Sequence, residues 1–197
     1  RNYPSARAAA LDGGNIPVEV YDQLLTAVHQ ALPALHRYME LRRRLLGVDV
    51  LHMYDLYTPL VSSEKKRYSF EQAKSLVKEG LATLGEDYQE LLQKGFDEGW
   101  IDVYENQGKR SGAYSWGAYG THVLLNYNGT LNHVFTLAHE MGHALHSWYS
   151  DHAQPYPYAG YRIFVAEVAS TCNESLLIHD LIGKAQEDSE KAYLINY

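Results

Sequence analysis

The sequence predicts a mainly helical, α+β fold that contains a small β-sheet. Apolar residues recur at helical spacing through most of residues 16–96 and again from residue 131 onward. Between these regions, residues 101–104 and 122–126 have the composition of short strands on either side of a glycine- and tyrosine-rich segment. Asn128-Gly129 is typical of a turn, so we expect the chain to leave the sheet there and enter the last helices.

The first third of the chain is expected to be helical. Residues 16–47 predict a helix that ends at Gly47, and Pro33 is expected either to kink this helix or to begin a second one. Residues 48–61, VDVLHMYDLYTPLV, are apolar and aromatic and include Pro59. They favour a buried connector over a regular element.

A second helical region follows this connector. Ser69 and Gln72 form a capping-box pattern, which predicts a helix that begins at this point and runs to about Leu84. Gly85 interrupts the pattern, and residues 86–96 predict another helix.

Composition excludes several classes of protein. The chain has 24 acidic and 17 basic residues, a balance unlike that of proteins that bind nucleic-acid backbones. The basic run at residues 42–44 is interpreted as a solvated helix face.

A single cysteine, Cys172, excludes an intrachain disulfide, and its setting favours a buried, inert thiol. No apolar run approaches the ~20 residues that cross a bilayer, and no signal peptide is recognised, so we expect a cytoplasmic protein that binds no membrane.

Residues 139–143 read HEMGH, an HExxH motif within a helix expected over about residues 131–150. Four residues of α-helix turn through about 400°, so His139 and His143 share one face and can reach one zinc ion. Glu140 is about 100° away around the helix, where it can reach a metal-bound water but does not bind the metal itself. Gly142 lowers helix propensity, which indicates that another segment packs closely there. The motif predicts one zinc ion per chain with Glu140 as the catalytic base.

A third zinc ligand is expected from the next helix, predicted over about residues 161–182. Glu167 and Glu174 lie two turns apart on nearly the same face, so we expect one to bind the metal and the other to be its neighbour. The position of Glu167 nearer the start of this helix favours it as the ligand, with Glu174 holding the outer N–H of a ligating imidazole. His146 lies near the ligand face and is expected to interact within the site without binding the metal.

Gly112, Ala113 and Tyr114 precede the motif in the small-residue segment. They can form an edge strand that pairs with an extended peptide, or part of a tyrosine-rich hairpin that packs on the core. Spacing alone leaves these alternatives open.

Four separated blocks together resemble a known family. TLAHEMGHALHSWYS, YAGYRIFVAEVASTCNESLL, LHMYDLYTPL and SGAYSWGAYGTHVLLNYNGTL are similar to the oligoendopeptidase F branch of the M3, thimet oligopeptidase-like metallopeptidases. This resemblance implies a helical zincin core and a zinc endopeptidase of short peptides. It assigns His139, His143 and Glu167 as ligands and Glu140 as the base, and it favours substrate contact at residues 112–114.

Members of that family are considerably longer than 197 residues, so we expect residues 1–197 to be one catalytic-core segment of a longer peptidase. Residues 1–99 would be a mostly helical lead-in, 100–130 a small sheet with substrate-side loops, and 131–197 the zinc-binding helices. The last two long helices are apolar around much of their circumference, which predicts that missing flanking chain or self-association covers them. The alternative function is a zinc-binding but catalytically inactive core or scaffold.

Overall fold

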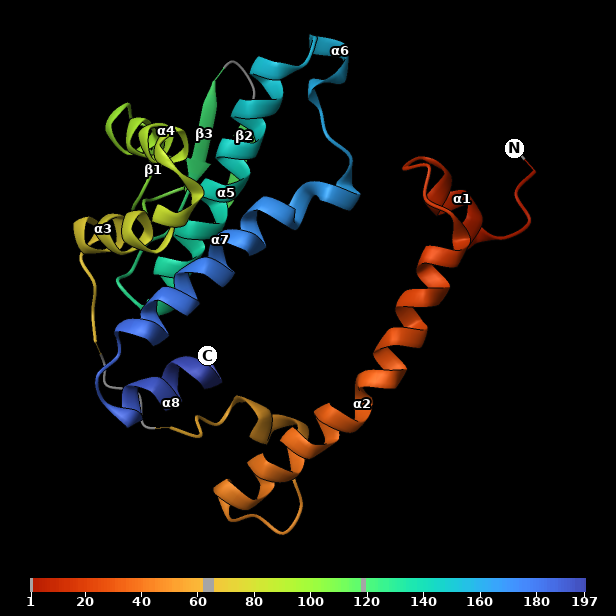
Figure 1. Cartoon of the computed structure of the whole chain (residues 1–197), viewed down its shortest axis with the longest axis vertical. Coiled ribbons are helices and arrows are strands. Elements are labelled where there is room, and N and C mark those ends of the chain that lie inside the picture. The colour runs from red at the N-terminus through yellow and green to blue at the C-terminus, as the bar shows by residue number, and fades with distance from the viewer. Residues whose placement is uncertain (1, 62–65, 118–119) are drawn as a thin grey trace. The chain divides into compact units, whose positions relative to one another are not determined.

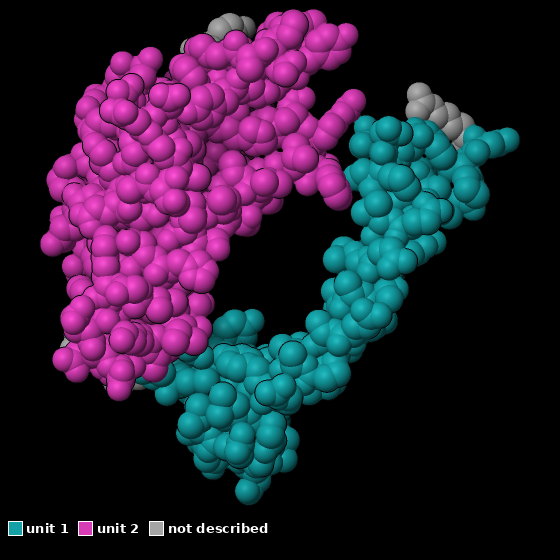
Figure 2. Space-filling view, viewed as in Figure 1, with its two compact units in different colours: residues 1–62, 196 teal, residues 63–195, 197 magenta. Residues whose placement is uncertain are grey.

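The computed structural model describes residues 2–61, 66–117 and 120–197. These residues are mainly helical and include one small three-stranded sheet, which confirms the predicted fold class (Figure 1). They form two compact units that divide near residue 62, with Asn196 grouped with the first unit (Figure 2). The division at residues 99 and 130 expected from the sequence stays a prediction.

The first unit contains α1 (Ala6–Asp12), α2 (Val18–Leu46) and the 3-10 turn η1 (Met53–Tyr57). Pro33 lies inside α2, so the expectation that it begins a second helix is wrong. Proline removes one backbone donor, which is a small part of the hydrogen bonding of a helix of 29 residues. Gly47 ends α2 in the left-handed conformation, at φ 67°, as predicted.

The connector after α2 is not buried. Met53, Tyr54 and Tyr57 are exposed, with Tyr57 at 89% of its full accessibility. The basic run also differs from the expected solvated face, because Arg42 is buried and donates hydrogen bonds from one guanidinium nitrogen to three backbone carbonyls of the connector. The apolar composition of the connector predicted its burial, whereas the structure places the connector at the surface of its unit.

The second unit begins with α3 (Phe70–Gly80), η2 (Ala82–Leu84) and α4 (Glu86–Asp97). The predicted capping box is present: the Ser69 hydroxyl accepts a hydrogen bond from the Gln72 amide, and the Gln72 side chain accepts one from the Ser69 amide. Gly85 separates η2 from α4 at φ 92°, a backbone conformation that glycine adopts without strain.

The sheet consists of β1 (Ile101–Asp102), β2 (Tyr114–Gly117) and β3 (Thr121–Leu124) in the order β1-β3-β2. β1 runs parallel to β3, with Ile101 opposite Val123, and β2 runs antiparallel to β3. The two predicted strands are therefore present but shorter than expected. β2 pairs with β3 and occupies an edge of the sheet, and whether residues 112–114 contact a peptide stays a prediction.

The chain then forms α5 (Leu131–Ala153), the short helix α6 (Tyr156–Ala159), α7 (Ile163–Lys184) and α8 (Asp188–Asn196). α5 carries ten buried residues and passes through the core of this unit, between α3 and α4, the sheet and α7 (Figure 1). A Cβ atom on Gly142 of α5 would lie only 2.6 Å from the Ser170 Cα of α7. The bare backbone at Gly142 thus allows a close helix crossing, as the sequence indicated.

One face of α7 is exposed. Ile163, Phe164 and Val168 are more than 60% accessible, and Cys172 is also exposed, so the prediction of a buried thiol is wrong. α7 is apolar on several sides, and the described residues cover only the sides that meet α5, α3 and α4. Among those residues, no helix is both long enough and apolar enough to span a bilayer.

Candidate metal centre

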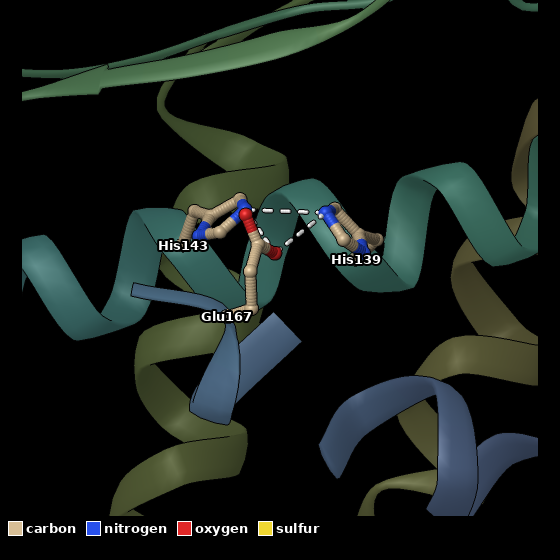
Figure 3. A group of neighbouring side chains, drawn as sticks. All are labelled: His139, His143 and Glu167. Carbon is tan, nitrogen blue, oxygen red and sulfur yellow. Dashed lines mark hydrogen bonds and ion pairs between the residues drawn. The ribbon is translucent and has the colours of Figure 1, made fainter. Parts of the chain in front are cut away.

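Two imidazoles from α5 lie side by side in the candidate site (Figure 3). Thr130 caps the start of this helix, and its hydroxyl accepts a hydrogen bond from the His133 amide. His139 and His143 are one turn apart, with ring centroids separated by 4.8 Å and ring planes at 82°. Their Nε2 atoms are 3.1 Å apart, so both rings present the same nitrogen to one point in space.

Glu167 reaches the same point from α7 (Figure 3). Its Oε2 atom lies 3.4 Å from the Nε2 atom of His139 and 3.2 Å from that of His143. The buried Ser170 hydroxyl donates a hydrogen bond of 2.7 Å to the same Oε2 atom. This hydrogen bond is the largest cause of the lowered pKa of Glu167, which therefore presents a carboxylate at neutral pH.

The spacing of these three groups fits a small metal ion. Two ligand atoms bonded to tetrahedral zinc at about 2.0–2.1 Å are about 3.4 Å apart, from the geometry of the tetrahedron. The separations of 3.1, 3.2 and 3.4 Å are close to that value. His139, His143 and Glu167 could therefore hold one ion and leave a fourth position open.

Glu174 contacts the other side of one imidazole. Its Oε1 atom lies 2.8 Å from the Nδ1 atom of His139. A carboxylate at this position favours a proton on Nδ1, which leaves the lone pair of Nε2 directed toward the centre. Glu167 thus lies with the Nε2 atoms of both imidazoles, whereas Glu174 lies against the outer nitrogen of His139. Which glutamate binds a metal stays a prediction.

Glu140 is buried, at 6% accessibility, and its Oε2 atom has no hydrogen-bond partner among the described residues. Burial is the largest cause of its raised pKa; the nearby His139 lowers this pKa and Glu167 raises it. An ionisable oxygen without a partner is costly to bury, so it is expected to have a role in the site.

The electrostatics of the second imidazole favour metal binding. Burial lowers the pKa of His143, and the neighbouring Glu167 carboxylate opposes part of this effect. His143 is therefore neutral near pH 7, which is the form that binds metals.

His146 follows His143 by three residues on α5. Its ring stacks on Tyr161 with centroids 3.8 Å apart, and its buried Nδ1 atom has no partner in the described part of the chain. Burial lowers the pKa of His146, and the proximity of His143 lowers it further. Its role in the site stays a prediction.

The predicted substrate segment lies next to α5. Tyr114 is the first residue of β2, and the Gly112 carbonyl accepts a hydrogen bond of 2.8 Å from the Asn126 side chain. Close packing continues along the strand, because a Cβ atom on Gly117 would lie 3.2 Å from the Ser147 Cβ of α5. The sheet therefore presents an edge strand beside the helix that carries both histidines.

Sequence reasoning missed two polar residues behind the centre. Asn173 of α7 and Tyr88 of α4 are joined by a hydrogen bond of 3.0 Å, and Asn173 also contacts the backbone of α5. The only available signal was an asparagine at a position that shares a helical face with Ser170 and Leu177.

Comparison with known proteins shows the family of the chain. Residues 1–196 match peptidase family M3. The whole chain is 49% identical to "Oligopeptidase PepF" of Bacillus subtilis and 48% identical to "Oligoendopeptidase F homolog" of Lactococcus lactis, and it covers 30% and 33% of these proteins. The crystal structure of oligoendopeptidase-F from Enterococcus faecium superposes with a TM-score of 0.65 at 36% identity, over the whole of this chain and 27% of that one.

The chain spans about a third of the length of the curated relatives that it matches. Within that third, the similarity extends through both helices that supply the candidate ligands. The chain belongs to peptidase family M3.

Proposed function

We propose that this chain supplies the catalytic centre of a zinc-dependent endopeptidase that hydrolyses internal bonds of short peptides. The observation that carries the proposal is the group formed by His139, His143 and Glu167, whose ligand atoms lie within 4.8 Å of one another. The names of its relatives, which are oligopeptidases and oligoendopeptidases, support the substrate class.

In this proposal His139 Nε2, His143 Nε2 and Glu167 Oε2 hold the zinc ion. When bound, zinc polarises the scissile carbonyl and lowers the pKa of a coordinated water. Glu174 keeps the proton of His139 on Nδ1, and Ser170 holds the Glu167 carboxylate in place by its hydrogen bond. These two contacts orient the ligands before the ion arrives.

Glu140 is the proposed general base. Its Oε2 atom accepts the proton of the attacking water and later delivers it to the leaving amine. The absence of a hydrogen-bond partner for this atom among the described residues supports the role, because no neighbouring group of the described chain competes for its lone pair. Burial, which raises the pKa of Glu140, also strengthens its affinity for that proton.

The edge strand β2 is the proposed site for the peptide backbone. A peptide that pairs with an edge strand is held by main-chain hydrogen bonds, which depend little on its sequence. Gly112 and Ala113 directly precede this strand and Tyr114 is its first residue; all three are proposed to contact substrate. Chain outside residues 1–197, or a second copy, is proposed to cover the exposed apolar face of α7, and a cytoplasmic location remains part of the proposal.

The second candidate function is a core that binds zinc but has no activity. It is favoured by the coverage of only about a third of the relatives, because groups that stabilise the transition state can lie in the other two thirds. The two candidates differ in turnover and agree in metal content.

The test combines metal analysis with cleavage of a quenched fluorescent peptide. One zinc per chain with turnover supports the endopeptidase, zinc without turnover supports the inactive core, and a protein that binds no zinc refutes both. The Glu140→Gln variant should keep zinc and lose about 10²- to 10⁴-fold in kcat, because it lacks the base but no ligand. Glu90→Gln, at an exposed position of α4, makes the same chemical change as a control and should leave kcat unaltered.

A further inference from the structure

α7 is fixed to its unit by few buried side chains. Its buried residues are Ser170, Asn173 and Leu177, which follow one another at helical spacing. Ser170 lies against Gly142, and the Leu177 side chain lies against Gly80. Asn173, at 1% accessibility, is a polar residue in a place where an apolar one would pack as well.

The Asn173 amide joins three helices. Its Nδ2 atom donates a hydrogen bond of 2.9 Å to the backbone carbonyl of Ala138 in α5. Its Oδ1 atom accepts a hydrogen bond of 3.0 Å from the Tyr88 hydroxyl of α4. Ala138 immediately precedes His139, and Asn173 immediately precedes Glu174, so this bond lies beside the contact between His139 and Glu174.

We propose that Asn173 is a positioning residue for the metal centre: its bond to Ala138 fixes the register of α7 on α5, and thereby the position of Glu167 against the two imidazoles. The inference rests on the proposed zinc site. In this proposal Asn173 touches neither the ion nor the substrate, and it acts only by setting the position of α7.

A directional bond adds to the packing of α7. Burial of apolar surface is non-directional, so Leu177 and the partly buried apolar residues of α7 do not by themselves select one particular carbonyl of α5. A shift by one residue moves the helix by about 1.5 Å, whereas ligand distances in a metal site must hold to about 0.2 Å. A hydrogen bond to a particular carbonyl tolerates far less movement than that shift.

Tyr88 fixes the orientation of the amide. If the amide were reversed, its oxygen would face the Ala138 carbonyl oxygen, and two acceptors would meet. Burial raises the pKa of Tyr88 to about 12, so its hydroxyl remains a protonated donor to Oδ1 at neutral pH. The pair therefore keeps the Nδ2 atom directed at α5.

The test compares Asn173→Leu with Leu177→Ala in the zinc-loaded protein. Leucine is similar in size to asparagine but cannot make either bond, whereas Leu177→Ala removes buried contacts from the same stripe and leaves the amide intact. We expect Asn173→Leu to raise the zinc dissociation constant, measured by chelator competition, by about 10- to 100-fold and to alter the visible spectrum of the Co²⁺-substituted protein. Its kcat should fall while KM changes by less than about threefold. Leu177→Ala should lower the melting temperature of the zinc-free protein and change the dissociation constant by less than about threefold.

Two further variants separate the two bonds. Asn173→Asp keeps size and the acceptor for Tyr88 but loses the donor to Ala138 once its carboxyl is ionised, so at a pH above that ionisation it should weaken zinc binding as Asn173→Leu does. Tyr88→Phe leaves the bond to Ala138 and should have a smaller effect than either. Unaltered zinc affinity and Co²⁺ spectrum in Asn173→Leu or Asn173→Asp would overturn the positioning role while leaving the zinc site intact. Failure of the unsubstituted protein to bind zinc would instead overturn the proposed function on which the inference rests.

Discussion

Substitution of Gly142 by alanine tests whether the helix crossing sets the geometry of the metal centre. The new Cβ would lie 2.6 Å from the Ser170 Cα, 2.9 Å from the Ala169 carbonyl oxygen and 2.9 Å from the Ser170 nitrogen. All three are backbone atoms, which cannot rotate away as a side chain can. Carbon atoms prefer separations of about 3.5–4.0 Å, so α7 must move away from α5 by about 1 Å.

Such a shift is large compared with the tolerance of the site. Glu167 lies one turn before Ser170, and its Oε2 atom is 3.2–3.4 Å from the two Nε2 atoms. A displacement of about 1 Å exceeds the roughly 0.2 Å over which ligand distances vary, so zinc affinity should fall by about 10- to 100-fold. Overpacking should cost about 1–3 kcal/mol of stability, offset by up to about 1 kcal/mol because alanine favours helix more than glycine does.

The assay is chelator competition for zinc, together with thermal unfolding of the zinc-free protein. Gly183→Ala is the matched control, because Gly183 also lies in a helix but, outside its own turn of that helix, no atom of the described residues lies within 4 Å of its hypothetical Cβ. This control should raise stability by up to about 1 kcal/mol and leave zinc affinity unaltered. Zinc affinity within about threefold of the parent in Gly142→Ala would refute the link between the crossing and the site.

Three further outcomes are expected. Ser170→Ala removes the hydrogen bond to Glu167 Oε2 and should weaken zinc binding by about 0.5–3 kcal/mol, measured by the same competition, because a bond to a charged group is lost; an unchanged affinity would show that Glu167 needs no such support. Removal of zinc should lower the melting temperature of the protein. Addition of zinc at 1,000 times its dissociation constant should then raise the free energy of unfolding by about 4 kcal/mol. A melting temperature independent of zinc would contradict binding of zinc to the folded state. Phe164→Glu, at a site 62% exposed on α7, should reduce the self-association seen by light scattering and leave the free energy of unfolding within about 0.5 kcal/mol of the parent. Equal self-association of the variant and the parent would show that the self-association surface lies elsewhere.

Local features of the fold were predictable from the sequence. The capping box joins Ser69 and Gln72 within a single turn, and the HExxH histidines face one way because helical geometry alone requires it. Their partners are three or four residues away, so no knowledge of the tertiary structure was needed.

Features that depend on distant segments were harder to predict. Glu167 and Glu174 share a face of α7, and their different places follow from where that helix crosses α5, at Gly142 and Ser170. Cys172 was expected to be buried and inert because no basic residue neighbours it in the sequence, and that argument does not reveal which side of the helix a neighbour covers. Asn173 had no motif to mark it, since its partners come from α4 and α5.

The division of the proposed ligands between two helices has a consequence for the order of folding. His143 and Glu167 are separated by 24 positions in the sequence, and α6 lies between them. A nascent chain that has formed only α5 offers two imidazoles and no carboxylate, so it lacks the third ligand that a catalytic zinc site requires. Hydrolytic competence would thus appear only after α7 has docked. A partly folded molecule, with its own unprotected segments close by, would be unable to cleave them.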